Sequence, residues 1–299
     1  MAVTTVPVLP ATTAPRRTPP PSPPHRRTSP TATILLLLGA AYCLLPVLWV
    51  LIASTKSAAE LFNTFTFAPS THLFDNIGFL TSYRDGLFWR WMANTALYAG
   101  VGAAASTLVS ASAGFALAKY DFRGKSFVFN VVLAGVLVPG VILAVPQYLL
   151  LAKVGMTNTY WAVLLPSMIS PYGIYLARIF AAATVPNEVL EAARMDGAGE
   201  WYIFWRIVMP LVKPALATLS IFTFLGSWNN FVWPLIATND PDKYTLPVAL
   251  ATFATDPNKS GGSNGMLMAG SFLIVLPVLV VFIALQRHFT QGIATAGMK

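Results

Sequence analysis

Six long apolar runs limit what this chain can fold into more than any other feature of its sequence. They lie at about residues 31–53, 91–118, 126–151, 160–177, 214–238 and 266–286. A helix needs about 20 apolar residues to cross the hydrocarbon core of a bilayer. Only 10% of the residues are charged, whereas a soluble domain carries about a quarter. We therefore predict an all-α membrane protein with six transmembrane helices.

The sequence before the first run has a different composition. Residues 1–30 contain nine prolines and four arginines but few large apolar residues. Such a segment cannot bury enough surface to offset the entropy lost on ordering. We expect a disordered basic tail, followed by one membrane domain over residues 31–299. A secretory signal is the alternative, but the first run is longer than the 7–15 or so apolar residues of a signal peptide.

The distribution of Lys and Arg predicts how the spans are oriented. If the N-terminus is cytosolic, the segments on that side carry thirteen of these residues and the opposite segments carry six. The positive-inside rule then places both termini and the segment 186–214 in the cytosol. Two long connections lie on the opposite side. We expect a short interfacial helix within residues 54–90, and a polar, mobile loop over residues 239–265.

Small residues and prolines recur inside the spans. In the second span, small residues repeat every four positions, which predicts close packing against a helix of this chain or of a partner. They are Gly102, Ser106, Ser110 and Gly114. Prolines free backbone carbonyls that protein or a water-filled cavity must satisfy, so they favour a polar pathway, with packing kinks as the alternative. Those within spans are Pro46, Pro139, Pro146, Pro166, Pro171, Pro234 and Pro277.

Ionisable residues are absent from all six runs. Ion-coupled pumps place such groups within the membrane, so uphill transport by this chain would need energy from another subunit. The chain has no complete nucleotide-binding motif, because Gly124-Lys125-Ser126 lacks the first glycine of the pattern. Its single cysteine, Cys43, lies in an apolar run, so we expect no metal site and no catalytic residues in this chain.

The net charge of +8 and the pI near 9.7 are also features of nucleic-acid-binding proteins. The excess of basic residues lies in the tail and in loops expected to face the cytosol. We therefore expect the chain to be surrounded by membrane lipid and not to bind nucleic acid.

The polar segment from Pro186 to Pro214, called the EAA loop below, predicts a helix, a break and a second helix. Glu188 and Glu191 suit the first turns of a helix, where the dipole favours carboxylates. Gly197 suits a left-handed helix stop, and we expect Pro210 to close the second helix. Alanines on the first helix leave a low surface that another protein could approach. The alternative is an amphipathic helix that rests on the membrane.

The EAA loop resembles the motif of bacterial ATP-binding-cassette (ABC) importer permeases. That pattern is Glu-Ala-Ala, three residues, Gly, nine residues and Ile-x-Leu-Pro; Glu191-Ala192-Ala193, Gly197, Ile207 and Pro210 match it, with Met209 in place of its Leu. Flanking segments, including SPYGIYLARIF and SWNNFVWPL, are similar to maltose-type (MalG-like) sugar permeases. The resemblance covers about residues 31–299.

The resemblance implies the type I importer permease fold and a set of partners. These are a second permease subunit, a dimer of ATP-binding subunits that carries the ATP and Mg²⁺, and an extracytoplasmic solute-binding protein. The chain itself would hold no cofactor and would lie in the bacterial plasma membrane. The EAA loop would supply the coupling helix, with a contact set expected to comprise Glu191, Ala192, Ala193, Arg194, Asp196 and Gly197.

Polar side chains in the fifth span suggest a solute pathway. Trp228, Asn229 and Asn230 combine amide groups with an aromatic ring, which suits the hydroxyls and the apolar ring face of a neutral sugar. The alternative is an interhelical hydrogen bond. Many permeases that this chain resembles have an acidic residue at the position of Asn230, so the role of that position does not carry over directly.

Other functions remain open at this point. A facilitator or secondary transporter would work without an ATPase, and a membrane scaffold would show no solute-dependent activity. Within the importer class, sugars, polyols and glycerol-phosphate share this type of permease, and the sequence does not choose among them.

Overall fold

The computed structural model describes residues 29–255 and 263–296, and all regular structure in them is helical. The predicted tail over residues 1–30 lies almost wholly outside this part of the chain. The longer helices are α1 (Pro30–Ser54), α3 (Leu73–Ser82), α4 (Leu87–Lys119), α5 (Lys125–Leu137), α6 (Ala144–Lys153), α7 (Tyr160–Ser167), α8 (Pro171–Thr184), α9 (Asn187–Met195), α11 (Met209–Trp228), α13 (Leu246–Thr255) and α14 (Ser263–Ala296). The short ones are α2 (Glu60–Asn63), α10 (Glu200–Ile203), the π-helix η1 (Phe204–Val208), α12 (Val232–Ala237) and the 3₁₀-helix η2 (Pro241–Lys243).

The chain divides into two compact units, residues 1–45 and 46–299, and helix α1 runs across the division. The part of α1 in the first unit is apolar on all sides and its side chains are exposed, as expected for a helix surrounded by lipid. The second unit contains all the other helices.

Five helical segments of the described residues are long and apolar enough to cross a membrane. They are Pro30–Ser54, Leu87–Lys119, Tyr160–Thr184, Glu200–Trp228 and Asn264–Ala284. Each overlaps one of the predicted spans. The structure therefore confirms the all-α prediction for the residues it describes, whereas it has five such segments where six were expected.

The predicted span over residues 126–151 is the one that is not among these five segments. It is divided into α5 and α6, and residues 138–143 between them are not helical. Pro139 and Gly140 account for the break, because proline lacks the N–H that an α-helix requires and glycine favours irregular backbone. The sequence did not predict this break, because residues 126–151 form one continuous, mainly apolar run.

Helix α4 forms the centre of the second unit, where it packs against α8 and α11. The small residues of α4 permit this packing. A Cβ atom on Gly114 would come within 2.6 Å of the Ala177 Cβ on α8, and one on Gly102 would come within 2.5 Å of the Ser167 Oγ. The four-residue pattern therefore serves packing inside this chain.

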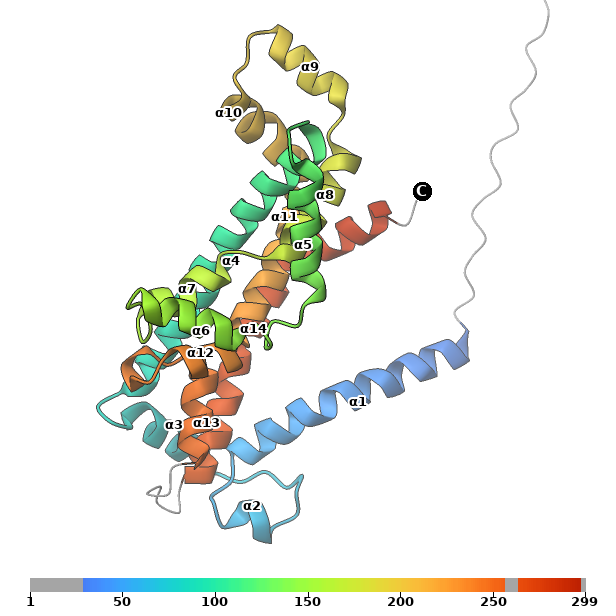
Figure 1. The fold of residues 1–299 in the computed structure, drawn as a ribbon. Coiled ribbons are helices and arrows are strands. Elements are labelled where there is room, and N and C mark those ends of the chain that lie inside the picture. Colours follow the sequence, from blue (N-terminus) through green and yellow to red (C-terminus); the bar gives the residue numbers. More distant parts are fainter. Residues whose placement is uncertain (1–28, 256–262, 297–299) are drawn as a thin grey trace, which may run out of the picture. The chain divides into compact units, whose positions relative to one another are not determined.

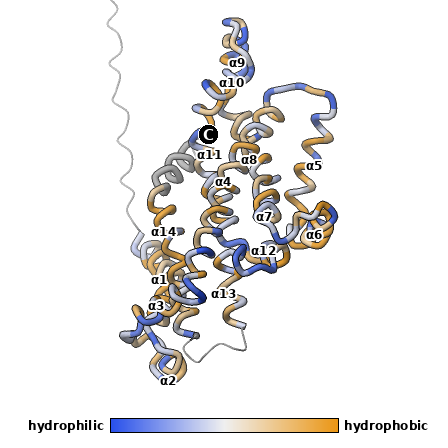
Figure 2. The backbone as a smooth tube through the Cα atoms, turned by 90° about the vertical axis from the view of Figure 1, so that its left-hand side faces the viewer, coloured by the Kyte–Doolittle hydropathy of each residue, from blue (hydrophilic) through white to orange (hydrophobic). Residues whose placement is uncertain are grey.

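Helices α9 and α10 lie at one end of the second unit, and α3 and α13 lie at the other (Figure 1). Helix α9 mixes hydrophilic and hydrophobic residues, whereas the helices between the two ends are mainly hydrophobic (Figure 2). The EAA loop and the connection over residues 54–90 are thus at opposite ends of the helical bundle.

The segment 239–265 corrects another expectation. In place of a wholly polar, mobile loop, it contains the buried helix α13. Leu246, Val248, Ala249, Leu250 and Phe253 are buried there, and four of them pack with α3 and α4 in one core cluster. The prediction gave too much weight to the charged and glycine residues on either side of this short apolar stretch. Residues 256–262 lie outside the described part.

Candidate functional site

A single leucine anchors helix α9, the first helix of the EAA loop, to the bundle. Leu190 is 2% exposed and belongs to a core cluster with Phe115 of α4, Val185 after α8, and Ile203 of α10. The helix starts after Pro186, whose φ of −68° and ψ of 140° are those of an extended residue. Pro186 is therefore the N-cap residue of α9, and Asn187 is the first helical residue.

Helix α9 ends in a Schellman motif, in which the two N–H groups after the helix bond back to its last turn. The Ala198 N–H donates to the Ala193 carbonyl over 2.9 Å, and the Gly197 N–H donates to the Arg194 carbonyl over 3.0 Å. Gly197 has a φ of +81°, which glycine adopts without a steric penalty. The predicted left-handed stop is confirmed.

The second helix of the EAA loop does not end at Pro210. Helix α10, the π-helix η1 and α11 follow one another without interruption from Glu200 to Trp228, through Pro210 and Pro214. In η1 the Met209 N–H bonds to the Phe204 carbonyl, five residues back. This wider turn directly before Pro210 locally replaces the α-helical bonding that a proline interrupts. The second half of the EAA loop is therefore continuous with a candidate span.

An internal network joins the two halves of the EAA loop to helix α4. The Arg194 Nε donates to the Glu200 Oε1 over 2.7 Å, and the Tyr120 hydroxyl donates to the Glu200 Oε2. The Arg194 guanidinium also lies 5.5 Å from the centre of the Tyr120 ring. Burial, followed by the hydrogen bond to Glu200, raises the pKa of Tyr120. Arg194 is thus held within the chain, although it was expected to serve contacts with another subunit.

The remaining residues of the expected contact set differ in exposure. Glu191, Ala192 and Asp196 are exposed, whereas Ala193 is half-buried against the core cluster that contains Leu190. Met195 is 89% exposed, and sequence reasoning did not include it. The exposed side chains of α9 and its C-cap thus include the carboxylates of Glu188, Glu191 and Asp196, the small side chain of Ala192 and the flexible apolar side chain of Met195.

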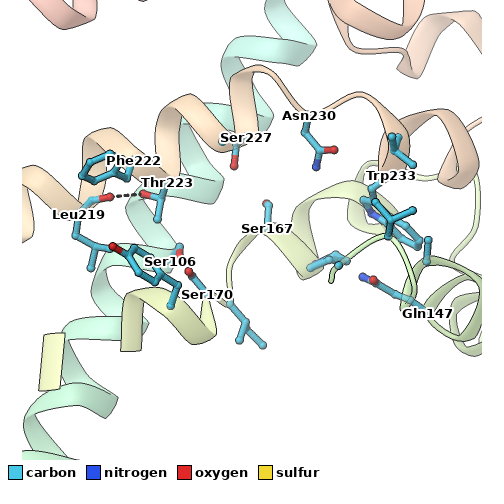
Figure 3. A pocket seen from close by; sticks show the side chains of 18 residues that line it. Ser106, Gln147, Ser167, Ser170, Leu219, Phe222, Thr223, Ser227, Asn230 and Trp233 are labelled. Atoms are coloured by element: carbon cyan, nitrogen blue, oxygen red, sulfur yellow. Dashed lines mark hydrogen bonds between the residues drawn. The ribbon is translucent and has the colours of Figure 1, made fainter. Parts of the chain in front are cut away.

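A cavity of about 520 Å³ lies in the middle of the bundle, away from the EAA loop. Its lining comes from α4, α6, α7, α8, α11, α12 and the segments between helices. Three helix breaks meet there: residues 138–143, 168–170 and 229–231. Polar side chains from these elements face one open space (Figure 3). They are Ser106, Gln147, Ser167, Ser170, Thr223, Ser227 and Asn230.

The three expected pathway residues occupy different environments. Trp228 is buried, and its Nε1 donates to the Ile274 carbonyl of α14 over 3.2 Å. Asn229 is exposed, and its Nδ2 donates to the Leu225 carbonyl over 2.9 Å. Asn230 lines the cavity and points into it (Figure 3).

Sequence reasoning missed most of the cavity lining, including Gln147, Ser167 and Ser227. Polar residues beside the prolines that interrupt spans were the available signal, because Gln147 follows Pro146 and Ser167 follows Pro166.

Comparison with known proteins gives a consistent result. Residues 106–295 match the family described as "Binding-protein-dependent transport system inner membrane component". The arabinooligosaccharides transport system permease protein AraQ of Halalkalibacterium halodurans is 38% identical over 87% of this chain and 92% of that protein. The lactose transport system permease protein LacG of Rhizobium radiobacter is 33% identical over 85% of this chain and 91% of that protein.

The fold also has a counterpart among crystal structures. A chain of a bacterial ABC transporter involved in the import of the acidic polysaccharide alginate aligns with a TM-score of 0.76 and 24% identity, over 87% of this chain and 95% of that chain. This likeness establishes the fold. The family match over residues 106–295 and the similar permeases show that the chain belongs to the family of binding-protein-dependent transport system inner membrane components.

Proposed function

We propose that this chain is one of two permease subunits of an ATP-driven, binding-protein-dependent importer of carbohydrates. The observation that carries the proposal is helix α9, which presents an exposed polar and small-residue surface at one end of the bundle and is anchored to that bundle by Leu190. A helix with these properties can receive force from another protein and pass it to the spans.

Docking on an ATP-binding subunit would use the exposed part of α9. Glu191 offers a carboxylate to a basic residue of that subunit, while Ala192 and Gly197 permit close approach. Ala193, Arg194 and Asp196 complete the proposed contact set, with Ala193 and Arg194 acting through the shape and rigidity of the loop. ATP and Mg²⁺ would bind to the partner and not to this chain.

The internal contacts support a route for the ATPase stroke. Leu190 contacts the core formed by α4, α8 and α10, and Arg194 reaches Tyr120 at the end of α4 through Glu200. A displacement of α9 would therefore be felt by helices that also line the cavity. Such rigid-body movement is one established way for a protein to alternate between two states.

The proposal includes six crossings, with both termini cytosolic in a bacterial plasma membrane. Helix α5 is 13 residues long and would span about 20 Å of a core about 30 Å thick. The break after it lines the cavity, which is where irregular backbone is tolerated within a membrane. Trp201 and Tyr202 are exposed at the start of α10 and suit the lipid interface.

The remaining partners follow from the same assignment. A second permease subunit would complete the pathway, and an extracytoplasmic solute-binding protein would deliver the solute; we expect no role for nucleic acid. Carbohydrate is proposed because similar permeases are named for the transport of arabinooligosaccharides and lactose. A polyol or glycerol-phosphate importer is the alternative within this class.

Affinity purification of the tagged chain from its native membrane tests the assignment. We expect an ATPase and a second permease to accompany it. The Glu191→Lys variant should insert normally but recover less ATPase or hydrolyse ATP without uptake. Asp121→Lys is the control, because Asp121 is a fully exposed carboxylate on the turn after α4 and outside α9. Its ion pair with Lys125 lies on the surface, where such pairs contribute little to stability. Equal recovery and uptake in Glu191→Lys would refute the docking role, and solute movement by the isolated chain would favour a facilitator.

A further inference from the structure

Among the residues that the structure describes, no charged side chain lines the central cavity. Hydroxyl and carboxamide groups supply its polarity, and aliphatic and aromatic groups make up the rest. An ionised group inside a membrane protein needs a counter-charge or water, because burial of an unpaired charge costs several kcal/mol or more. The part of the cavity that this chain lines therefore offers no counter-charge to a carboxylate or a phosphate.

Several of its polar groups are available to a ligand. Among the described residues, the side chains of Gln147, Ser227 and Asn230 make no hydrogen bond within the chain. The Ser106 hydroxyl is fully buried beside the same space and also has no partner. Gln147, Ser227 and Asn230 are partly exposed, so a ligand hydroxyl can reach their side chains, whereas the Ser106 hydroxyl has no accessible surface in this structure.

Other polar groups of the lining serve the protein itself. The Ser167 hydroxyl donates to the Leu164 carbonyl over 2.7 Å, and the Ser170 hydroxyl accepts from the Gly173 N–H over 3.0 Å. The side chains without partners are thus a distinct subset, and they come from α4, α6, the end of α11 and the break after it. They present both donors and acceptors, since a carboxamide and a hydroxyl each offer both.

An aromatic ring with a fixed orientation completes the lining. The Trp233 Nε1 donates to the Ala162 carbonyl over 3.0 Å, which holds the indole in place at the edge of the cavity (Figure 3). An apolar ring face beside groups that bond hydroxyls matches the two kinds of surface of a sugar. The cavity volume of about 520 Å³ lies within the range of about 300–1,000 Å³ typical of small-molecule sites.

We propose that this cavity binds uncharged, polyhydroxylated solutes directly and discriminates against carboxylated and phosphorylated ones. The inference rests on the proposed importer function and narrows its substrate class to neutral saccharides and polyols. It assigns ligand contact to Gln147, Ser227 and Asn230. The discrimination comes from missing counter-charge, so it acts in addition to any selection by a solute-binding protein.

Protection of a thiol from labelling tests the proposal on the purified complex in nanodiscs, without the solute-binding protein. In a Cys43→Ala background, Ser227→Cys places one thiol in the cavity. A neutral trisaccharide, a uronate trisaccharide and a sugar phosphate are compared as protectants at about 0.1–10 mM, where weak sites fill. Labelling slows by a factor of 1 + [L]/Kd, which is about elevenfold when the concentration is ten times Kd.

Protection by the neutral solute alone is the expected result. Gln147→Lys, combined with Ser227→Cys, should then give protection by the two acidic solutes, because it adds a cation to the lining. Asn63→Cys is the control, since Asn63 is exposed and outside the cavity, and no solute should slow its labelling.

Two outcomes would overturn the proposal. Equal protection of Ser227→Cys by neutral and acidic solutes would show that the lining does not discriminate by charge. Absence of protection by every solute would show that the cavity is not a binding site. Copurification of the ATPase and ATP-dependent uptake remain measurable in either case, so failure of this inference is distinguishable from failure of the importer assignment.

Discussion

The close contact between α4 and α8 at Gly114 makes one substitution especially informative. A Cβ atom at this position would lie 2.6 Å from the Ala177 Cβ, 2.7 Å from the Arg178 backbone nitrogen and 2.8 Å from the Ala177 carbonyl carbon. Two of these three atoms belong to the backbone of α8, so a side-chain rotation cannot relieve the clash. Gly114→Ala must push the two helices apart.

The magnitude follows from the geometry. Carbon atoms in favourable contact are about 3.5–4.0 Å apart, so α8 would have to move by about 1 Å. Overpacking of this kind typically costs about 1–3 kcal/mol, and replacing a glycine in a helix interior returns about 0.5–1 kcal/mol. We expect a net loss of about 1–2 kcal/mol in the free energy of unfolding.

Gly100→Ala provides the matched control on the same helix. A Cβ atom on Gly100 meets no atom within 4 Å, so only the gain in helix propensity applies, about 0.5–1 kcal/mol. The apparent free energy of unfolding of both variants is measured by circular dichroism in mixed micelles with a denaturing detergent. The reasoning is refuted if Gly114→Ala is as stable as the unmodified chain or shifts in the same direction as Gly100→Ala.

Three further predictions concern the two ends of the bundle. Gly197→Val should destabilise the end of α9, because a branched residue at a φ of +81° is strained by about 1–2 kcal/mol or more. Gly199→Ala is the control and should change little, because Gly199 has a φ of −71°. Hydrogen exchange in α9 should be faster in Gly197→Val and unchanged in Gly199→Ala. Asn76→Leu should destabilise the end of α1 by about 1–3 kcal/mol, because the buried Asn76 Nδ2 donates to two carbonyls there over 2.9 Å each; an unchanged unfolding transition would contradict this. Hydrogen bonds from Ser57 and Ser70 lower the pKa of Glu60 from its ordinary value of 4.5. The Glu60 carboxylate therefore stabilises residues 57–70 above that value, and this stabilisation is lost as the pH falls through the lowered pKa. Hydrogen exchange of residues 57–70, corrected for intrinsic exchange rates, should rise on acidification in the unmodified chain and not in Glu60→Gln.

The sequence predicted the features that depend on composition and on local backbone geometry. Long apolar runs predicted the all-α class. Gly197 predicted the left-handed stop of α9, because a glycine at the end of a polar helix commonly serves to end it. The small residues of α4 predicted close helix packing, which Gly102 and Gly114 provide.

Features that depend on three-dimensional context were not predictable in the same way. The sequence does not show that a π-turn would carry the helix through Pro210, or that the break at Pro139 would separate α5 from α6. The cavity residues are spread along the chain from Ser106 to Trp233 and become a group only when three helix breaks meet. Of the three pathway residues predicted, only Asn230 lies among them.

The meeting of these three breaks has a mechanical consequence. Three segments lack the continuous backbone hydrogen bonds of an α-helix: residues 138–143, 168–170 and 229–231. Each connects two helices, and we expect the angle between those two helices to change more easily than the helices themselves bend. All three joints lie at the height of the cavity, which makes this level of the bundle a shared hinge. A small tilt of the helices between the cavity and α9 would then change the shape of the cavity, while the helices on the other side of the cavity keep their packing.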